Sequence, residues 1–210
     1  MRKIVRDAGV SSASTATEQD AFEDLLRLAK KGDADAFSSL WTIFQPGLLR
    51  YLRVIGGQAA EDLAADTWLQ VIRKLTTFEG NDKAFRAWIC TIARNRHIDW
   101  RRQTARRRES LVESEVLDRI PTLDDTETSM STHRAVALIA TLPPDQAEAV
   151  MLRTVAGLSV SAVAEIMGRP AGTVRVLCHR GLRRLAFTLE GTVPDEASGA
   201  KNAQATEVVV

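Results

Sequence analysis

The stretch GLSVSAVAEIMGRPAGTVRVLCHRGLRRL, residues 157–185, has the pattern of two helices joined by a tight turn. In its first half, Val160, Val163 and Met167 recur at helical spacing behind Ser159, a residue type favoured at helix N-caps. A glycine then permits the positive φ that ends a helix, and Pro170 prevents continuation. The spacing therefore predicts a helix, a sharp turn and a second helix.

The second of these helices is expected to start near residues 171–173 and to separate apolar from basic side chains. Its apolar stripe comprises Val174, Leu177, Cys178, Leu182 and Leu185. Its other face carries Arg175, Val176, His179, Arg180 and Arg183. Residues 169–184 contain five arginines and no acid. These features favour a helix-turn-helix whose second helix enters the DNA major groove, over an ordinary helical hairpin with a solvated basic face.

Within such a helix, position along the axis separates residues that read bases from residues that hold phosphates. Arg175 lies near the N-terminus, where helix-turn-helix proteins approach base edges. Arg180 and Arg184 lie further along, where the helix leaves the groove and passes phosphates. We expect DNA contacts from Arg169, Thr173, Arg175, Val176, His179, Arg180 and Arg183.

The net charge of +1 conceals blocks of opposite sign along the chain. Residues 83–108 contain nine basic side chains and one acid, and residues 109–127 contain seven acids and one arginine. The helix-turn-helix is basic again. Two basic modules separated by an acidic connector indicate two nucleic-acid contacts made by one chain.

Bulk composition excludes several classes of protein. The chain has 210 residues, 45% of them hydrophobic, which suffices for one or two small cores. No apolar run has the length of a membrane span, and the N-terminus lacks a signal-peptide core. Cys90 and Cys178 are expected to be reduced core residues of a cytoplasmic protein. No metal cluster, cofactor motif or catalytic constellation emerges, so we expect no cofactor and no small-molecule substrate.

The first half of the chain predicts several helices after a flexible tail over residues 1–20. Helical patterns cover residues 21–31, 33–44 and 48–55, with Pro46 at a break or at the first turn of the third. A stronger helix is predicted over 60–78, with the apolar stripe Trp68, Val71, Ile72 and Leu75 and with Asp62, Asp66, Gln70 and Arg73 on its other side. That polar side is either a solvated face or a docking face for a protein.

A polar loop over residues 79–83 leads into a helix dense with arginine. Phe85, Trp88, Ile89, Ile92, Ala93 and Ile98 supply its apolar positions. Its basic side chains, Arg86, Arg94, Arg96, Arg101 and Arg102, must find water or phosphate, and the planar guanidinium suits phosphate. Trp88 is expected in the core, and His97 is expected to be exposed or to face DNA.

Two groups of motifs resemble one known family, over roughly residues 20–188. The run Glu61-Asp62-Leu63, Asp66-Thr67-Trp68-Leu69, Phe85-Arg86-Ala87-Trp88, Ile92-Ala93-Arg94-Asn95, Asp99 and Arg101-Arg102 resembles the second conserved region of extracytoplasmic-function sigma factors. The run Leu142-Pro143-Pro144-Asp145-Gln146, Gly157-Leu158-Ser159 and Gly172-Thr173-Val174-Arg175 resembles the fourth region. Their order, their spacing and the acidic connector make the resemblance specific.

The resemblance implies a transcription initiation factor that binds core RNA polymerase and promoter DNA, with an anti-sigma factor as a further partner. Asp62, Ala65 and Asp66 would lie at the polymerase clamp; relatives often carry Gln at the position of Ala65. The minus-ten element would meet Lys83, Arg94, Asn95, Arg96, Asp99, Arg101 and Arg102, with Asn95 helping to hold a flipped base. The helix after Pro170 would read the minus-thirty-five element.

We therefore predict an all-α protein of two small helical domains joined by a flexible acidic linker. The predicted boundaries are 1–20 for the tail, 21–105 for the first domain, 106–131 for the linker, 132–189 for the helix-turn-helix domain and 190–210 for a second tail. Because each core is small, the placement of the domains is expected to depend on partners. The alternatives are a stand-alone helix-turn-helix regulator and an enzyme using Asp62 with Asp66 or His97 with Asp99.

Overall fold

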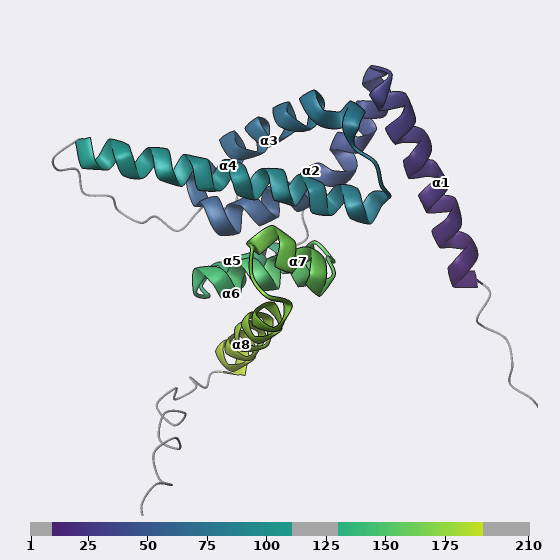
Figure 1. The fold of residues 1–210 in the computed structure, drawn as a ribbon. Helices are drawn as coiled ribbons and strands as arrows, with labels where there is room; N and C mark the ends of the chain where they lie inside the picture. Colours follow the sequence, from purple (N-terminus) through teal and green to yellow (C-terminus); the bar gives the residue numbers. More distant parts are fainter. Residues whose placement is uncertain (1–9, 111–129, 191–210) are drawn as a thin grey trace, which may run out of the picture.

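The computed structural model describes residues 10–110 and 130–190, where every element is helical (Figure 1). This agrees with the predicted all-α class. The first domain consists of α1 (Val10–Lys30), α2 (Ala34–Gly56), α3 (Ala60–Lys74) and α4 (Asp82–Ser110), with short 3-10 turns at Gly57–Ala59 and Leu75–Thr77. The second consists of α5 (Met130–Ala140), α6 (Pro144–Val150), a π-helical turn at Met151–Val155, α7 (Val160–Met167) and α8 (Ala171–Glu190).

Aromatic rings from three helices form the centre of the first domain. Phe85 of α4 is fully buried, and its ring centroid lies 4.9 Å from that of Phe44 on α2. It lies 5.6 Å from Phe22 on α1 and 5.1 Å from Phe78, which follows α3. The Phe44 and Phe78 rings meet Phe85 edge to face, and such pairs add to the free energy gained from burying the rings. This cluster fixes the N-terminal half of α4 against α1 and α2.

Helices α1 and α2 both extend beyond the limits expected from the sequence. Helix α1 begins at Val10, inside the segment predicted to be a flexible tail, because adding a residue to an existing helix gains a backbone hydrogen bond without a new nucleation step. Helix α2 continues through Pro46, where we expected either a break or the first turn of a new helix. Buried Leu40 and Leu48 pack on either side of the proline, and tertiary packing overrides the local preference.

The linker and the tails fall largely outside the described residues. Helix α4 continues to Ser110, past the predicted start of the linker at residue 106, and α5 begins at Met130. Residues 111–129, which hold most of the acidic connector, and the segments 1–9 and 191–210 lie outside the described ranges. The predicted flexibility of these segments stays a prediction.

The turn of the helix-turn-helix has the predicted chemistry. The Ser159 hydroxyl accepts a hydrogen bond from the backbone N–H of Ala162 at 3.1 Å, which caps α7. Gly168 ends α7 in the left-handed conformation, with φ of 63°. Helix α8 then begins directly after Pro170. The local signals of cap, left-handed glycine and proline are sufficient to place this turn.

The buried face of α8 differs from the predicted stripe at one position. Leu182 is 48% exposed, whereas the adjacent Gly181 is buried. A Cβ atom at Gly181 would lie 2.7 Å from Cγ2 of Val150, a buried and β-branched neighbour on α6. Helices α6 and α8 therefore cross at a position that only glycine can occupy, and this crossing rotates Leu182 outward.

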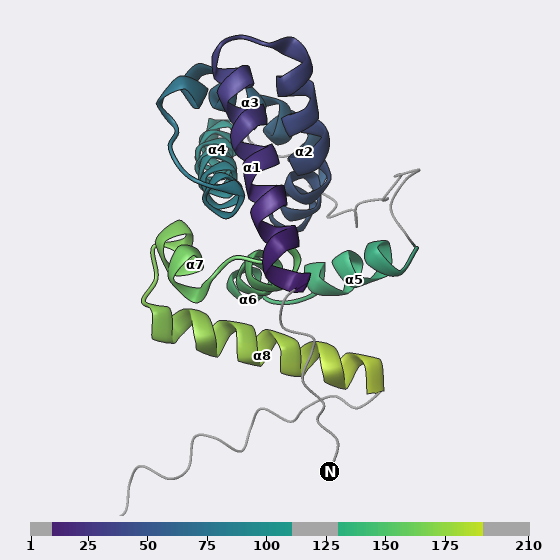
Figure 2. The same cartoon turned by 90° about the vertical axis from the view of Figure 1, so that its right-hand side faces the viewer.

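The two domains pack against each other in this structure. Helix α2 contacts α5, α6 and the π-helical turn, while α4 contacts α7. Figure 2 shows α8 on the far side of α6 and α7 from the first domain. Among the described residues, no helix is both long and apolar enough to cross a membrane.

Candidate nucleic-acid and protein interfaces

Helix α3 presents an exposed acidic face opposite a buried apolar one. Asp62, Ala65 and Asp66 are all exposed, while Leu63 and Val71 on the other side are buried. The three residues assigned from the resemblance therefore share one accessible surface. Because the carboxylates are exposed, their charge is available to a basic partner.

Two apolar side chains enlarge this face. We predicted Ile72 in the buried stripe, but it is 53% exposed, and Leu69 one turn earlier is 50% exposed. The buried positions of α3 are occupied in part by smaller or polar residues. One of them is Thr67, whose hydroxyl donates a hydrogen bond to the Leu63 carbonyl at 2.6 Å. A surface that combines carboxylates with exposed leucine and isoleucine is typical of a protein docking site.

The start of α4 is fixed by a cap and by the aromatic cluster. The Asn81 side chain accepts from the backbone N–H of Ala84 at 2.9 Å, and Phe85 is buried one residue later. Lys83 lies in the first turn and is exposed. Trp88, predicted in the core, is partly buried and packs against Phe78, with ring centroids 4.9 Å apart.

Further along α4, an amide and a carboxylate interrupt the arginines. Asn95 is exposed and accessible from solvent. Asp99 lies within 3.1 Å of the Arg96 guanidinium and within 4.0 Å of that of Arg102. Asp99 thus orients arginines on its own helix, and Arg101 beside it is exposed. Five of the seven residues predicted for the minus-ten contact, Lys83, Asn95, Asp99, Arg101 and Arg102, lie exposed along this helix, and Arg96 is half-buried.

His97 is half-buried rather than fully exposed, and it stacks on Trp100 with ring centroids 6.0 Å apart. Burial, together with the nearby charges of Arg101 and Arg94, lowers the pKa of His97 to about 4. The imidazole is therefore neutral at pH 7. It supports the exposed indole of Trp100 by stacking and adds no positive charge for phosphate.

Arg94 pairs with a carboxylate of the second domain, a partner that the sequence did not lead us to expect. Its Nε donates to Oε1 of Glu148 on α6 at 2.8 Å. The Tyr51 hydroxyl of α2 donates to the same oxygen at 2.9 Å. Burial, followed by the charge of Glu148, raises the pKa of Tyr51 well above its usual value, so the phenol keeps its proton and remains a donor.

The basic face of α8 is open to solvent. Arg175, Val176, His179, Arg180 and Arg183 are all exposed, and Thr173 is half-buried in the first turn. Arg183 lies over the ring of Phe187, with its guanidinium carbon 5.4 Å from the centroid. Val174 is fully buried beneath this face. The segregation of faces predicted from the sequence is correct here.

Arg169 in the turn is already engaged by an acid of the same domain. Its Nη2 lies 2.8 Å from Oδ2 of Asp145, at the start of α6, and both side chains are about half exposed. An exposed ion pair of this kind contributes little to stability and exchanges readily with other partners. Arg169 therefore remains accessible to DNA phosphate.

The structure adds no site of metal chemistry within residues 10–110 and 130–190, where no three potential ligands gather. Among the described residues, Asp62 and Asp66 belong to no group of three side chains that could hold a metal ion. Cys90 and Cys178 are free thiols, the first buried and the second half-buried. Burial raises the pKa of Cys90 to about 12, so its thiol is protonated and unreactive in this conformation.

Comparison with known proteins decides the family. Residues 40–107 match the family described as Sigma-70 region 2, and residues 133–185 match Sigma-70, region 4. The chain is 30% identical over 184 residues to the ECF RNA polymerase sigma factor SigD of Mycobacterium tuberculosis, covering 83% of this chain and 86% of SigD. This chain belongs to the extracytoplasmic-function (ECF) sigma factors of RNA polymerase. The resemblance inferred from the motifs is confirmed.

Two further sigma factors are similar to this one. The ECF sigma factor BldN of Streptomyces coelicolor is 34% identical over 180 residues, covering 83% of this chain and 66% of BldN. The solved structure of the sigma factor RpoE from Bartonella quintana, in complex with the anti-sigma factor NepR, superimposes with a TM-score of 0.57 at 26% identity. That match covers 73% of this ECF sigma factor and 96% of the solved chain.

Sequence reasoning missed two residues that join the domains of this ECF sigma factor. Glu148 is an acid inside the otherwise apolar run Ala147 to Leu152, and Tyr51 is the only tyrosine in the chain. A carboxylate in a buried run signals that a partner must lie nearby. The sequence holds that signal, but it does not identify the partner, which comes from the other domain.

Proposed function

We propose that this ECF sigma factor uses three separate surfaces to start transcription. The exposed face of α3 binds the polymerase clamp, α4 binds the minus-ten element, and α8 reads the minus-thirty-five element. The observation that carries this assignment is that one acidic and two arginine-rich helix faces occur in the sigma region 2 and region 4 order. As a sigma factor, the chain directs core RNA polymerase to promoters and promotes DNA opening.

The α4 surface is suited to single-stranded DNA. Opening a duplex requires a protein that binds separated strands better than paired ones, and a captured, unstacked base supplies that preference. Asn95 offers both hydrogen-bond donors and an acceptor to a base edge, and it is exposed. Arg101 and Arg102 lie one to two turns further along and offer bidentate phosphate contacts.

The α8 surface is suited to the major groove of a duplex. Arg175 and Val176 lie exposed near its N-terminus, where base edges are within reach. His179, Arg180 and Arg183 continue the same exposed surface toward the C-terminus and supply phosphate contacts.

Partners and location follow from this role. We infer an anti-sigma factor, because the similar sigma factor RpoE of Bartonella quintana is solved in complex with one. The chain acts in the cytoplasm, where RNA polymerase transcribes. It supplies binding surfaces rather than catalysis, and polymerase carries out the chemistry.

The alternative function is a stand-alone helix-turn-helix regulator, which would bind its operator without polymerase. The region 2 match over residues 40–107 argues against it, because such a regulator has no need of that domain. The two functions differ in one observable, which is whether stable, specific binding to promoter DNA requires core polymerase.

Asn95→Ala tests the opening function. We expect this change to reduce the permanganate reactivity of thymines in the promoter bubble by about tenfold or less, consistent with the loss of one or two hydrogen bonds to a base. Initial binding of the holoenzyme to promoter DNA should change far less, because the basic side chains that contact phosphates remain.

Gln103→Ala provides the matched control, since it removes an exposed amide from the same helix. This control should leave both permanganate reactivity and promoter binding at the level of the unmodified chain. If Asn95→Ala gives the same bubble as the unmodified chain, Asn95 does not hold a base.

A further inference from the structure

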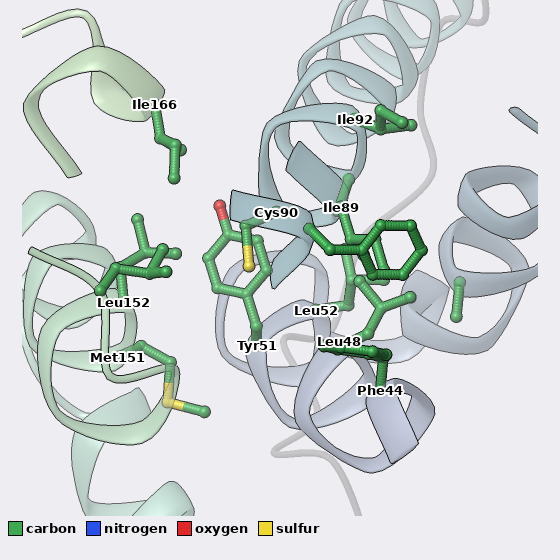
Figure 3. Close-up of a cluster of buried hydrophobic side chains, with 14 of the residues drawn as sticks. Phe44, Leu48, Tyr51, Leu52, Ile89, Cys90, Ile92, Met151, Leu152 and Ile166 are labelled. Atoms are coloured by element: carbon green, nitrogen blue, oxygen red, sulfur yellow. The ribbon is translucent and has the colours of Figure 1, made fainter. Parts of the chain in front are cut away.

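The contact between the two domains continues the hydrophobic core of each. Figure 3 shows Tyr51 and Cys90 of the first domain between Leu52 on one side and Met151 with Leu152 of the second domain on the other. All five side chains are buried. Burial of apolar surface at this contact favours the closed arrangement of the free chain.

A single carboxylate lies at the edge of this core. Oε1 of Glu148 accepts hydrogen bonds from Tyr51 and from Arg94, at 2.9 and 2.8 Å, and both donors belong to the first domain. The Glu148 side chain is 11% exposed and that of Arg94 is 23% exposed. A charge this well buried requires its partners, because desolvation without them is costly. The position of Glu148 therefore depends on the domains being closed.

The donor that Glu148 engages belongs to the proposed DNA surface. Arg94 lies on α4 immediately before Asn95, among the arginines assigned to the minus-ten element. A guanidinium binds carboxylate and phosphate oxygens with the same donor groups. While Glu148 occupies the Nε of Arg94, this arginine is turned toward α6 and is withheld from DNA. Helix α8, by contrast, lies on the far side of α6 from the first domain (Figure 2), and its basic side chains are exposed.

We propose that Glu148 competes with DNA phosphate for the guanidinium of Arg94. Its hydrogen bonds to Arg94 and Tyr51, which we call the latch, hold the two domains of the free chain together and keep Arg94 from binding single-stranded DNA. Tyr51 strengthens the latch through its hydrogen bond to the same oxygen. The role of Arg94 in this proposal rests on the function proposed above. Binding of the minus-ten strand requires the latch to open, whereas the α8 surface remains accessible in both states.

A native thiol reports whether the latch is open. Cys90 lies one helical turn before Arg94, so the two share the face of α4 that meets the second domain, and Cys90 is only 4% exposed. With Cys178 replaced by serine, Cys90 is the single thiol of the full chain. The rate at which N-ethylmaleimide alkylates it then measures how often the domains separate.

Glu148→Gln is the principal variant. We expect Cys90 to be alkylated about tenfold faster, consistent with the loss of one charge-assisted hydrogen bond from the closed state. Tyr51→Phe removes only a hydroxyl and should accelerate alkylation by a smaller factor. Asp145→Asn is the matched control: it is also an acid-to-amide change on α6, but it removes the exposed pair with Arg169, and the rate should not change.

Binding of a short fluorescein-labelled single-stranded oligonucleotide gives the second measurement. Glu148→Gln should tighten this binding, because Arg94 is released. Arg94→Gln should accelerate alkylation as Glu148→Gln does, yet weaken oligonucleotide binding. The double variant should be alkylated no faster than either single variant, because both changes break one contact. Far-UV circular dichroism melting confirms that each variant is folded.

Two results would overturn the proposal. Alkylation of folded Glu148→Gln and Tyr51→Phe at the parent rate would mean that Glu148 does not hold the domains together. Faster alkylation with unchanged oligonucleotide binding would mean that the contact does not withhold Arg94. The alkylation assay contains neither polymerase nor promoter, so a failure of the chain to open promoters would contradict the proposed function and leave the alkylation result intact.

Discussion

Asp62→Arg combined with Asp66→Arg is expected to lower the affinity of the sigma factor for core RNA polymerase by at least about 100-fold. The two carboxylates lie exposed on one face of α3, beside the exposed side chains of Leu69 and Ile72. Reversing both charges converts attraction to a basic surface into repulsion at the centre of the proposed contact. Fluorescence anisotropy of labelled chain titrated with core polymerase measures the change.

The first helix offers a matched control for this double reversal. Asp20 and Asp24 have the same spacing on α1, and both are exposed. Changing both to arginine alters the net charge of the chain equally, so it should leave polymerase affinity within about threefold, as expected for screened surface charges. If the α3 variant binds polymerase as tightly as the control does, the polymerase clamp binds another surface of this sigma factor.

Arg175→Ala is expected to cost about 1–3 kcal/mol at the preferred minus-thirty-five sequence and to relax selection there. Arg175 is exposed near the N-terminus of α8, and buried Val174 beside it fixes the helix to the domain. Sequence selection should be lost at one or two base pairs of the minus-thirty-five element, and the preference at its other base pairs should not change. Holoenzyme selection from a promoter with a randomised minus-thirty-five element gives the sequence preference directly.

Arg180→Ala provides the comparison, since this exposed arginine lies more than one turn further along α8. A phosphate contact carries no sequence information, so its loss should weaken all sequences alike and reduce the salt dependence of binding. Equal loss of affinity for every sequence in Arg175→Ala, with the ranking intact, would show that Arg175 does not read bases.

Helix positions and the basic surfaces could be predicted because they depend on local chemistry. The cap at Ser159 and the left-handed Gly168 are determined by residues within one turn of them. The exposed face of Asp62, Ala65 and Asp66 follows from helical periodicity alone. In each case the physical cause lies within a few residues of its effect.

The predictions of buried positions were wrong where a helix packs against a segment that is distant in the sequence. Periodicity placed Leu182 in the buried stripe of α8, but the crossing with α6 requires Gly181 at the closest approach. Ile72 is exposed for a related reason, since the neighbouring helices cover Val71 and Leu75 instead. Such rotations of a helix by a fraction of a turn depend on its packing partner, which periodicity cannot specify.

The contact between the two domains could not be predicted from the sequence. Small separate cores predict that the placement of the domains depends on partners, which stays a prediction, and in this structure the domains share buried contacts. Arg94 was expected to need water or phosphate, and it found a carboxylate 54 residues further along the chain. Nothing near Arg94 in the sequence indicates that partner.

The central claim is that this chain directs core RNA polymerase to promoters. Single-round run-off transcription with purified core polymerase and a library of genomic fragments tests it most directly. We expect discrete transcripts that require the chain and that share a pair of upstream elements, with none of these transcripts from core polymerase alone. The same transcripts with and without the chain, or tight binding of the chain to its own sites without polymerase and without any added transcript, would contradict it.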